Sequence, residues 1–415
     1  MAFLTLLFYL FVIYIRPGEW VPAFANWRIL QLATVAVLFF MATEMALGKR
    51  AFAKVPHNGM LLGLFASILL SHAVHTYIGG MIGSFGFFST NVVVYLLIAN
   101  IVTTPRRLQV TLWLLIGLSA ALAIQGIHQS QTGLGWAGQP LVLDGMVPRI
   151  DWIGIFEDPN DLGLAFVMVI PLLLGEIFKR EFFLFKIVPL VLLGVLIYGV
   201  YLTNSRGGII ALMAAFAYFF IKRSRWRVVG GFVGLALAAL IFLFGPSRLG
   251  IMSAGEESAA QRLGAWYHGF QLLKASPIFG RGQGMFTDAY PLTAHNSFIL
   301  AFAELGLVGF YFWVGLLYVS FKTFSIVQQH DRRLAPYAFG LQAGLVGFSA
   351  AAFFLSRTYI LLPYLLVALS AATLNIAHRT NPACDFVFTR IDRRNVVLAC
   401  AAIIALIQIA MKTWL

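Results

Sequence analysis

Basic side chains in polar turns are the first features of this 415-residue sequence that could carry chemistry. Arg206 stands in the polar turn TNSRGG, residues 203–208, between two apolar segments. Ser205 or Asn204 can cap the helix that follows, and the first amides of that helix carry a partial positive charge to which Arg206 adds a full one. The combination suits a phosphate or a diphosphate. An arginine that merely extends to the membrane interface gives the same sequence, and on chemistry alone we weigh the two interpretations equally.

Two more arginines, Arg262 and Arg281, lie in a long polar segment further along the chain. Arg262 falls on a predicted amphipathic helix, where contact with lipid headgroups is the alternative to a catalytic role. Arg281 lies in the glycine run GRGQG, residues 280–284, which has neither the preceding strand nor the spacing of a dinucleotide-binding loop. We interpret this run as a flexible turn that lets the segment fold over a bound headgroup.

His295 is the candidate proton acceptor. It stands in AHNSF, residues 294–298, at the start of a long apolar segment. A neutral imidazole there can take a proton from a hydroxyl at physiological pH. A helix-cap or interface histidine is the alternative, and it would be favoured if His295 stood alone. Glu304 follows nine residues later and, at about 100° per residue, faces the opposite side of the helix, which makes it a poor candidate to orient His295.

Three weaker candidates complete the set. Arg357 occupies a very short turn and can face the same cavity. His72 and His75 share a helix face, but no third ligand is spaced beside them, so a packed pair is favoured over a metal site. The acidic run EDPND, residues 157–161, is interpreted first as a helix cap.

The elements that position these residues must be membrane helices. The chain is 60% hydrophobic and 11% charged, with a mean hydropathy of +0.86, whereas a soluble domain carries about a quarter charged residues. This composition excludes a water-soluble globular enzyme. Two cysteines, Cys384 and Cys400, are too few for a disulfide framework or a thiolate metal cage. The net charge of +13 is better explained by membrane topology than by nucleic-acid binding.

Apolar stretches near the ~20 residues that cross a bilayer recur through the whole chain. We predict an all-α, polytopic membrane protein that forms one domain over residues 1–415, with no internal repeat. The first stretch lacks a basic leader and a cleavage site, so it is predicted to be an uncleaved span. The predicted spans are residues 2–15, 28–47, 59–76, 88–104, 108–127, 154–178, 183–203, 207–221, 228–245, 296–321, 335–355, 360–377 and 395–411.

The distribution of charge orients the predicted spans. With the N-terminus in the cytoplasm, the cytoplasmic loops carry most of the 29 lysines and arginines, as the positive-inside rule requires. Two outer loops are long, residues 128–153 and 246–294. In the larger loop, apolar side chains at helical spacing predict an amphipathic helix on the bilayer surface that Pro277 ends. Those side chains are Leu263, Trp266, Tyr267, Phe270 and Leu273.

The order of these pieces resembles the O-antigen ligase and polymerase superfamily over roughly residues 200 to 310. The pattern is a TxSRG turn at 203–207, a loop with Arg262 and Trp266, a PxxGxG stretch at 277–282, and HN at 295–296 followed by ELG at 304–306 and Gly309. Each motif is weak by itself. Their order, spacing and common outer placement make the combination fairly specific.

The resemblance implies glycosyl transfer at the periplasmic face of a Gram-negative inner membrane. The donor is a glycan on undecaprenyl diphosphate, the acceptor is lipid A-core, and no cofactor, metal ion, nucleotide sugar or nucleic acid is expected; membrane lipids are the remaining partners. By motif, Arg206 and Arg262 neutralise the departing diphosphate, and His295 activates the acceptor hydroxyl for in-line attack with inversion. Residues expected to bind substrate are Arg281, Arg357, Ser205 and Asn296. The superfamily commonly has twelve spans with both termini in the cytoplasm, so we expect about twelve.

Other functions remain open at this stage. An O-antigen polymerase or a protein O-oligosaccharyltransferase of the same superfamily needs the same donor chemistry. Polymerases are described with an arginine and a glycine eleven residues later in two outer loops; at that spacing from Arg149, Arg248, Arg262 and Arg281 stand Asn160, Ala259, Leu273 and Leu292, which favours a ligase. Protein glycosyltransferases carry additional C-terminal soluble sequence. A secondary transporter predicts ionisable residues in mid-span and an inverted repeat, neither of which is evident.

Overall fold

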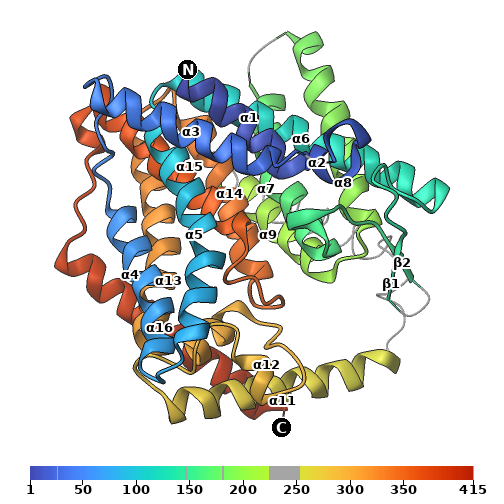
Figure 1. Cartoon of the computed structure of the whole chain (residues 1–415), viewed down its shortest axis with the longest axis vertical. Helices are drawn as coiled ribbons and strands as arrows, with labels where there is room; N and C mark the ends of the chain where they lie inside the picture. The colour runs from blue at the N-terminus through green and yellow to red at the C-terminus, as the bar shows by residue number, and fades with distance from the viewer. Residues whose placement is uncertain (26, 145–146, 180–181, 224–252, 415) are drawn as a thin grey trace.

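The computed structural model describes residues 1–25, 27–144, 147–179, 182–223 and 253–414, and almost all of its regular structure is helical (Figure 1). The elements, in chain order, are α1 (Ala2–Ile15), α2 (Pro17–Trp20), η1 (Pro22–Phe24), α3 (Ile29–Ala46), α4 (Pro56–Ala73), α5 (Ile78–Ile101), α6 (Pro105–Thr132), β1 (Val142–Asp144), β2 (Val147–Arg149), η2 (Gly154–Phe156), α7 (Pro159–Ile177), η3 (Phe183–Lys186), α8 (Ile187–Leu202), α9 (Arg206–Arg223), α11 (Ser253–Ala275), α12 (Phe286–Ala289), α13 (Ser297–His330), α14 (Ala335–Ala351), α15 (Leu361–Thr380), η5 (Pro382–Cys384) and α16 (Arg390–Trp414).

The prediction of an all-α polytopic membrane protein is confirmed. Eight helices among the described residues are long and apolar enough to cross a membrane, and Ala2–Ile15 is a shorter apolar helix. Each predicted span coincides with a helix except 228–245, which lies outside the described residues. The eight are α3, α5, α6, α7, the continuous stretch Phe183–Leu202, α13, α15 and α16.

Polar side chains set the starts of several of these helices. Thr104 accepts a hydrogen bond from the Arg107 amide at the start of α6, and Asp158 accepts one from the Asn160 amide at the start of α7. Asn296 accepts two at the start of α13. These side chains satisfy amides that lack a partner within the helix. The interpretation of the acidic run 157–161 as a helix cap is thereby confirmed for Asp158.

Helix α14 lies among the helices that position the candidate site residues. It packs against α7, α9 and α13, and α13 and α15 are neighbours in turn. In Figure 1, α11 lies across one end of this bundle, crosswise to α13, which it contacts. The predicted helix is therefore found, and it ends before Pro277, while its place on the bilayer surface stays a prediction. Phe270 of α11 is buried and its ring lies 5.0 Å from that of Phe302 in α13, whereas Tyr267 is 55% exposed and lies off the packed face.

The predicted outer loop 128–153 contains structure that periodicity missed. Helix α6 continues to Thr132, so the loop begins later than predicted. Strands β1 and β2 then form a short antiparallel hairpin, in which Val142 pairs with Arg149. The strands have three residues each, too few for an alternating pattern to stand out in the sequence.

Helix α13 is broken at Gly306, where φ is 64° and ψ is −168°. The segment 277–282 fills the break: the Leu307 amide donates to the Pro277 carbonyl at 2.8 Å, and the Gly282 amide donates to the Glu304 carbonyl at 2.9 Å. Gly280 and Gly282 are buried. The interpretation of the glycine run as a flexible turn is therefore wrong, because this segment supplies the partners that the broken helix lacks.

We predict that Gly306→Ala destabilises the protein by about 2–3 kcal/mol, since this region of φ/ψ is open essentially to glycine alone. A Cβ there would also lie 2.3 Å from the Ile278 carbonyl oxygen. The measurement is the thermal unfolding midpoint of the purified protein in detergent. Gly117→Ala in α6 is the matched control, because a Cβ there meets nothing within 4 Å. Equal midpoints for the two variants would contradict this role of Gly306.

Candidate functional site

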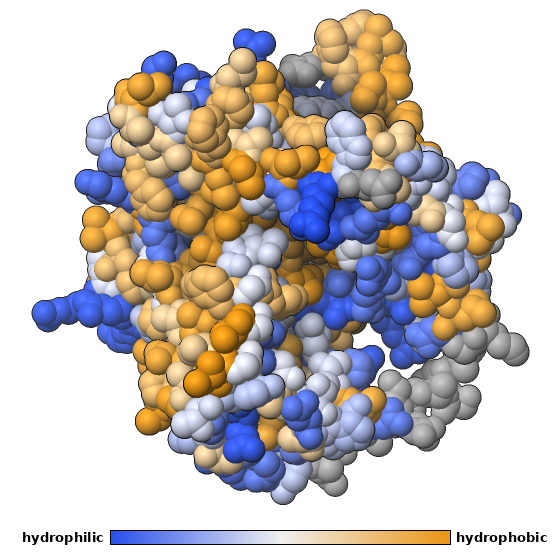
Figure 2. Space-filling view, viewed as in Figure 1, coloured by the Kyte–Doolittle hydropathy of each residue, from blue (hydrophilic) through white to orange (hydrophobic). Residues whose placement is uncertain are grey.

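Arg206, Arg262, His295 and Arg357, here called the basic cluster, lie together although they come from four separate parts of the chain. Arg206 is the first residue of α9, Arg262 lies on α11, His295 precedes α13, and Arg357 lies between α14 and α15. The electrostatic effects described below connect each member to another. Figure 2 shows a hollow bordered by hydrophilic side chains between α11 and the region of the β1–β2 hairpin.

The turn between α8 and α9 places Arg206. Ser205 Oγ accepts a hydrogen bond from the Gly208 amide at 2.9 Å, so Ser205 caps α9 as predicted. The same hydroxyl donates to Asn160 Oδ1 at 2.7 Å, which ties the turn to the start of α7. Asn204 has a left-handed backbone with φ of 47°, and its side-chain amide donates to the Pro148 carbonyl at 2.8 Å. The Ser205 side chain is buried, and both of its hydrogen bonds hold the turn that carries Arg206. That Ser205 also contacts the substrate stays a prediction.

Arg149 is a positioning residue that the sequence did not single out for this site. Its side chain is buried; Nε donates to the Thr203 carbonyl at 2.9 Å and Nη2 to Asn160 Oδ1 at 3.0 Å. Asn160 therefore accepts from both Arg149 and Ser205. The only signal in the sequence is that Arg149 lies in a predicted outer loop. The sequence does not indicate which residues it contacts.

The segment around His295 is held in a strained conformation. His295 has φ of 47°, in the left-handed region that costs a residue with a Cβ about 1–2 kcal/mol. Its neighbours are fixed on one side: Asn296 Oδ1 accepts from the Phe298 amide at 2.9 Å, and the Ser297 amide donates to the Ala352 carbonyl at 2.7 Å. Arg357 adds a further bond, from its amide to Ser297 Oγ at 2.7 Å. Strain that flanking contacts maintain in this way is typical of functional sites.

Burial lowers the pKa of the half-buried His295, and the positive charges of Arg262 and Arg357 lower it further. Burial also lowers the pKa of Arg262, with a further contribution from Arg206. Both effects disfavour additional positive charge in the cluster. These effects favour the neutral imidazole, and no hydrogen bond joins its ring to another residue in the part of the chain that the structure describes.

Arg357 lies beside His295, as predicted, but its charge is already compensated. Its guanidinium forms ion pairs with Asp158 and with Asp161. Both side chains of the Asp161 pair are largely buried, with exposed fractions of 16% for Arg357 and 11% for Asp161. The acidic run was interpreted only as a cap, so this second role of its carboxylates was missed. Arg262 lies next to His295, and Arg206 lies next to Arg262, so these two arginines also place positive charge near the imidazole.

The structure does not bring Arg281 to the basic cluster. Arg281 is exposed, and its amide donates to the Ala303 carbonyl at 3.2 Å in the segment that fills the α13 break. The adjacent Gly280 carbonyl accepts from His75 Nε2 at 2.9 Å. Nearby, His72 Nε2 is hydrogen-bonded to Ser84 Oγ at 2.8 Å. The two histidines thus pack among the glycine-rich segment and α5, which agrees with the interpretation of a packed pair.

Glu304 also serves the fold rather than the imidazole. Its carboxylate is buried and accepts a hydrogen bond from the Phe286 amide at 3.1 Å, which fixes the start of α12. Among the described residues, no hydrogen bond joins Glu304 to His295. The prediction that Glu304 does not orient His295 is confirmed. The Asn296 side chain, predicted to bind substrate, caps α13 and keeps its buried Nδ2 without a partner among the described residues.

The basic cluster places groups that can bind an anion beside a group that can accept a proton. Arg206, at the start of α9, and Arg262 present positive charge where a phosphate oxygen can be bound. His295 presents a neutral imidazole within the same electrostatic environment and can accept a proton. An anion and a hydroxyl that bind here together would meet both groups.

Comparison with known families bears directly on this site. Residues 190–314 match the family model described as O-Antigen ligase. The segment runs from α8 into α13 and contains Arg206, Arg262 and His295, whereas Arg357 lies beyond it. The resemblance seen in the sequence is confirmed over this segment. Among curated proteins, none matches this sequence.

We predict that Arg262→Gln raises the pKa of His295, because the variant removes a positive charge that disfavours the imidazolium. The measurement is an NMR titration of protein labelled at the histidine Cε1, with the His295 signal assigned through His295→Asn. Arg281→Gln is the matched control and should leave the titration midpoint where it is. A midpoint that stays unchanged in Arg262→Gln would contradict the electrostatic coupling of the cluster.

Proposed function

We propose that this chain is an O-antigen ligase that transfers a glycan from undecaprenyl diphosphate to a sugar hydroxyl of lipid A-core. The reaction takes place at the periplasmic face of a Gram-negative inner membrane, inverts the anomeric centre and needs no metal ion. One observation carries the proposal: a neutral His295 lies beside Arg262, which is coupled in turn to Arg206, within the segment that matches the ligase family.

The chemistry follows from these side chains. His295 takes the proton from the acceptor hydroxyl as its oxygen attacks the anomeric carbon. The bond from that carbon to the diphosphate oxygen breaks, and its electron pair leaves with the diphosphate. Arg206 and Arg262 compensate the developing negative charge, a role for which one well-placed donor is worth about 3–4 kcal/mol. Attack from the face opposite the leaving group gives inversion.

The lowered pKa of His295 has a specific consequence for this reaction. Before chemistry, Arg262 and Arg357 disfavour protonation of the imidazole, which keeps the base available. During chemistry, the leaving diphosphate gains negative charge close to the same arginines. That charge offsets their repulsion, so His295 accepts the proton when the leaving group departs. Proton transfer and bond cleavage are thus coupled through the electrostatics of one site.

The first prediction for this function is transfer by the purified protein in the presence of EDTA. The substrates are undecaprenyl diphosphate-linked glycan and lipid A-core, and the products are separated by size. We expect glycan on lipid A-core. A lengthening donor ladder without labelled acceptor would instead indicate a polymerase. If folded protein forms no product, ligase activity is excluded under these conditions. Protein acceptors would then be tested first, and transport second.

The second prediction separates binding from chemistry. We expect His295→Ala to lower turnover by a factor of about 10²–10⁴, the usual contribution of a general base, with donor binding largely retained. Arg206→Ala should weaken both turnover and donor binding, because its charge acts on the diphosphate before and during cleavage. His330→Ala, an exposed histidine in the last turn of α13, is the control. Normal transfer by well-folded His295→Ala protein would remove the general-base role.

A further inference from the structure

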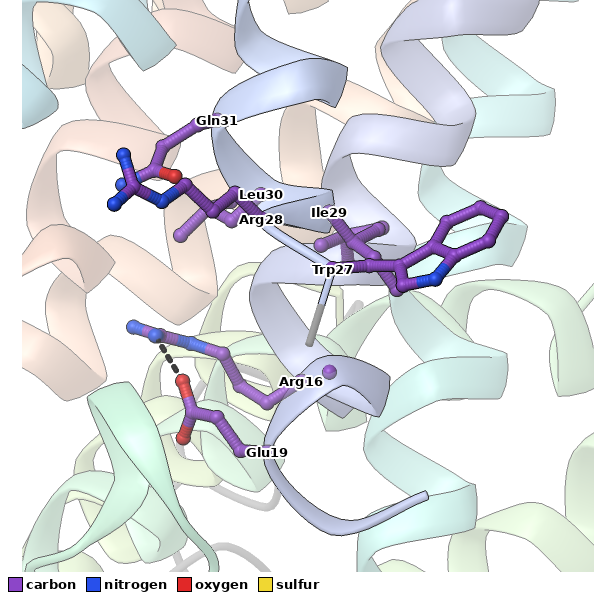
Figure 3. A pocket seen from close by; sticks show the side chains of 9 residues that line it. Arg16, Glu19, Trp27, Arg28, Ile29, Leu30 and Gln31 are labelled. Carbon is purple, nitrogen blue, oxygen red and sulfur yellow. Dashed lines mark hydrogen bonds and ion pairs between the residues drawn. The ribbon is translucent and has the colours of Figure 1, made fainter. Parts of the chain in front are cut away.

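A polar pocket of about 270 Å³ lies where the chain turns from α1 to α3, outside the basic cluster. Its polar lining consists of Arg16, Glu19, Arg28 and Gln31. Figure 3 shows the guanidinium groups of Arg16 and Arg28 extending to the same side of the pocket, while Trp27 points the other way. Two cations that face one opening provide a place for an anion.

The charges in this pocket are not balanced. Arg16 Nη1 pairs with Glu19 Oε1 at 2.5 Å, but Arg16 Nε is buried without a hydrogen-bond partner. Arg28 is exposed, and no described residue forms a hydrogen bond or ion pair with its side chain. Two arginines therefore stand against one carboxylate. A ligand with a single negative charge would neutralise the pocket.

An apolar pocket of about 600 Å³ adjoins the polar one and shares Trp27 and Ile29 with it. It extends between α1 and α3, from the α1–α3 connection to Thr5 and Ala36. Phe8 is 52% exposed, although it is a large hydrophobic side chain. Figure 2 shows that hydrophobic side chains dominate the visible face along α1, α3 and α4. The helix rises about 15 Å over the ten residue steps from Thr5 to Ile15, which is roughly half the hydrocarbon thickness of a bilayer.

The polar pocket is firmly attached to the body of the protein. Arg16 holds a left-handed backbone with φ of 53°, and the preceding Tyr14 carbonyl accepts a hydrogen bond from Trp152 Nε1 at 2.9 Å. The rings of Trp20 and Trp152 meet edge to face at 5.8 Å. Trp152 lies between β2, which ends at Arg149, and α7, which Asp158 caps. The pocket therefore lies at the same end of the bundle as the basic cluster.

We propose that the polar and apolar pockets together bind one anionic phospholipid of the surrounding membrane. Its phosphate lies between Arg16 and Arg28, and one acyl chain lies in the apolar pocket between α1 and α3. A guanidinium group can bind two phosphate oxygens at once. The length of an acyl chain in one leaflet matches the length of the apolar pocket. Because the pocket carries one excess positive charge, it favours a headgroup with net charge −1 over a zwitterionic one. The proposal does not depend on the proposed ligase activity.

The test is native mass spectrometry of the full-length protein in detergent, titrated with phosphatidylglycerol. We expect Arg28→Gln to lower phosphatidylglycerol retention about tenfold, the effect of losing one charge-assisted contact. Ala36→Phe, which fills the apolar pocket, should lower it independently, and Lys54→Gln, an exposed charge outside the pocket, should not. Thermal unfolding midpoints equal to those of the parent protein show that the variants are folded.

Two further measurements test whether the bound anion is a phospholipid rather than a soluble phosphate. Glycerol 3-phosphate at millimolar concentration should fail to displace the lipid, because it lacks the acyl chain. Phosphatidylethanolamine should be retained more weakly than phosphatidylglycerol. The proposal is overturned if Arg28→Gln retains phosphatidylglycerol as the parent protein does, if phosphatidylethanolamine is retained equally well, or if glycerol 3-phosphate displaces the lipid.

Discussion

Repulsion among arginines at one end of a helical bundle is the constraint on which the candidate site depends. Arg206, Arg262 and Arg357 all act on one another or on His295, and burial strengthens such interactions because the surroundings polarise less than water. Part of this charge is compensated within the described residues. Arg357 receives two carboxylates, Asp158 and Asp161. Arg262 and Arg206 still disfavour further positive charge around His295, and an anionic leaving group there would offset that effect.

The same constraint explains the positioning contacts around the cluster. Arg149 donates to the Thr203 carbonyl and to Asn160, and its Nη1 forms an ion pair with Asp144 at 3.5 Å. Asn160 in turn accepts from Ser205, which caps α9. One side-chain amide therefore joins the β2 strand, α7 and the turn that presents Arg206. Backbone groups in an apolar environment must find partners within the protein, and these contacts supply them.

Much of the fold could be predicted from the sequence because membrane helices are set by local composition. The spans, the helix α11 and the caps at Ser205 and Asp158 all follow from residues close together in the chain. The chemistry of Arg206, Arg262 and His295 could also be proposed, since the residue types alone indicate it. What could not be predicted are contacts across the chain. The pairing of Arg357 with Asp158 joins residues 199 positions apart, and no periodicity encodes it.

The glycine-rich segment shows why local interpretation failed there. In the sequence, GRGQG reads as a flexible turn, since glycine is the usual residue of mobile loops. In the structure, Gly280 and Gly306 are required because their backbones approach each other closely: a Cβ on Gly306 would lie 2.6 Å from the Gly280 amide nitrogen. The reason for either glycine becomes evident only when the positions of both backbones are known. The break in α13 also gives Glu304 and His295 separate tasks, because Glu304 binds the Phe286 amide while His295 keeps its ring open to the basic cluster.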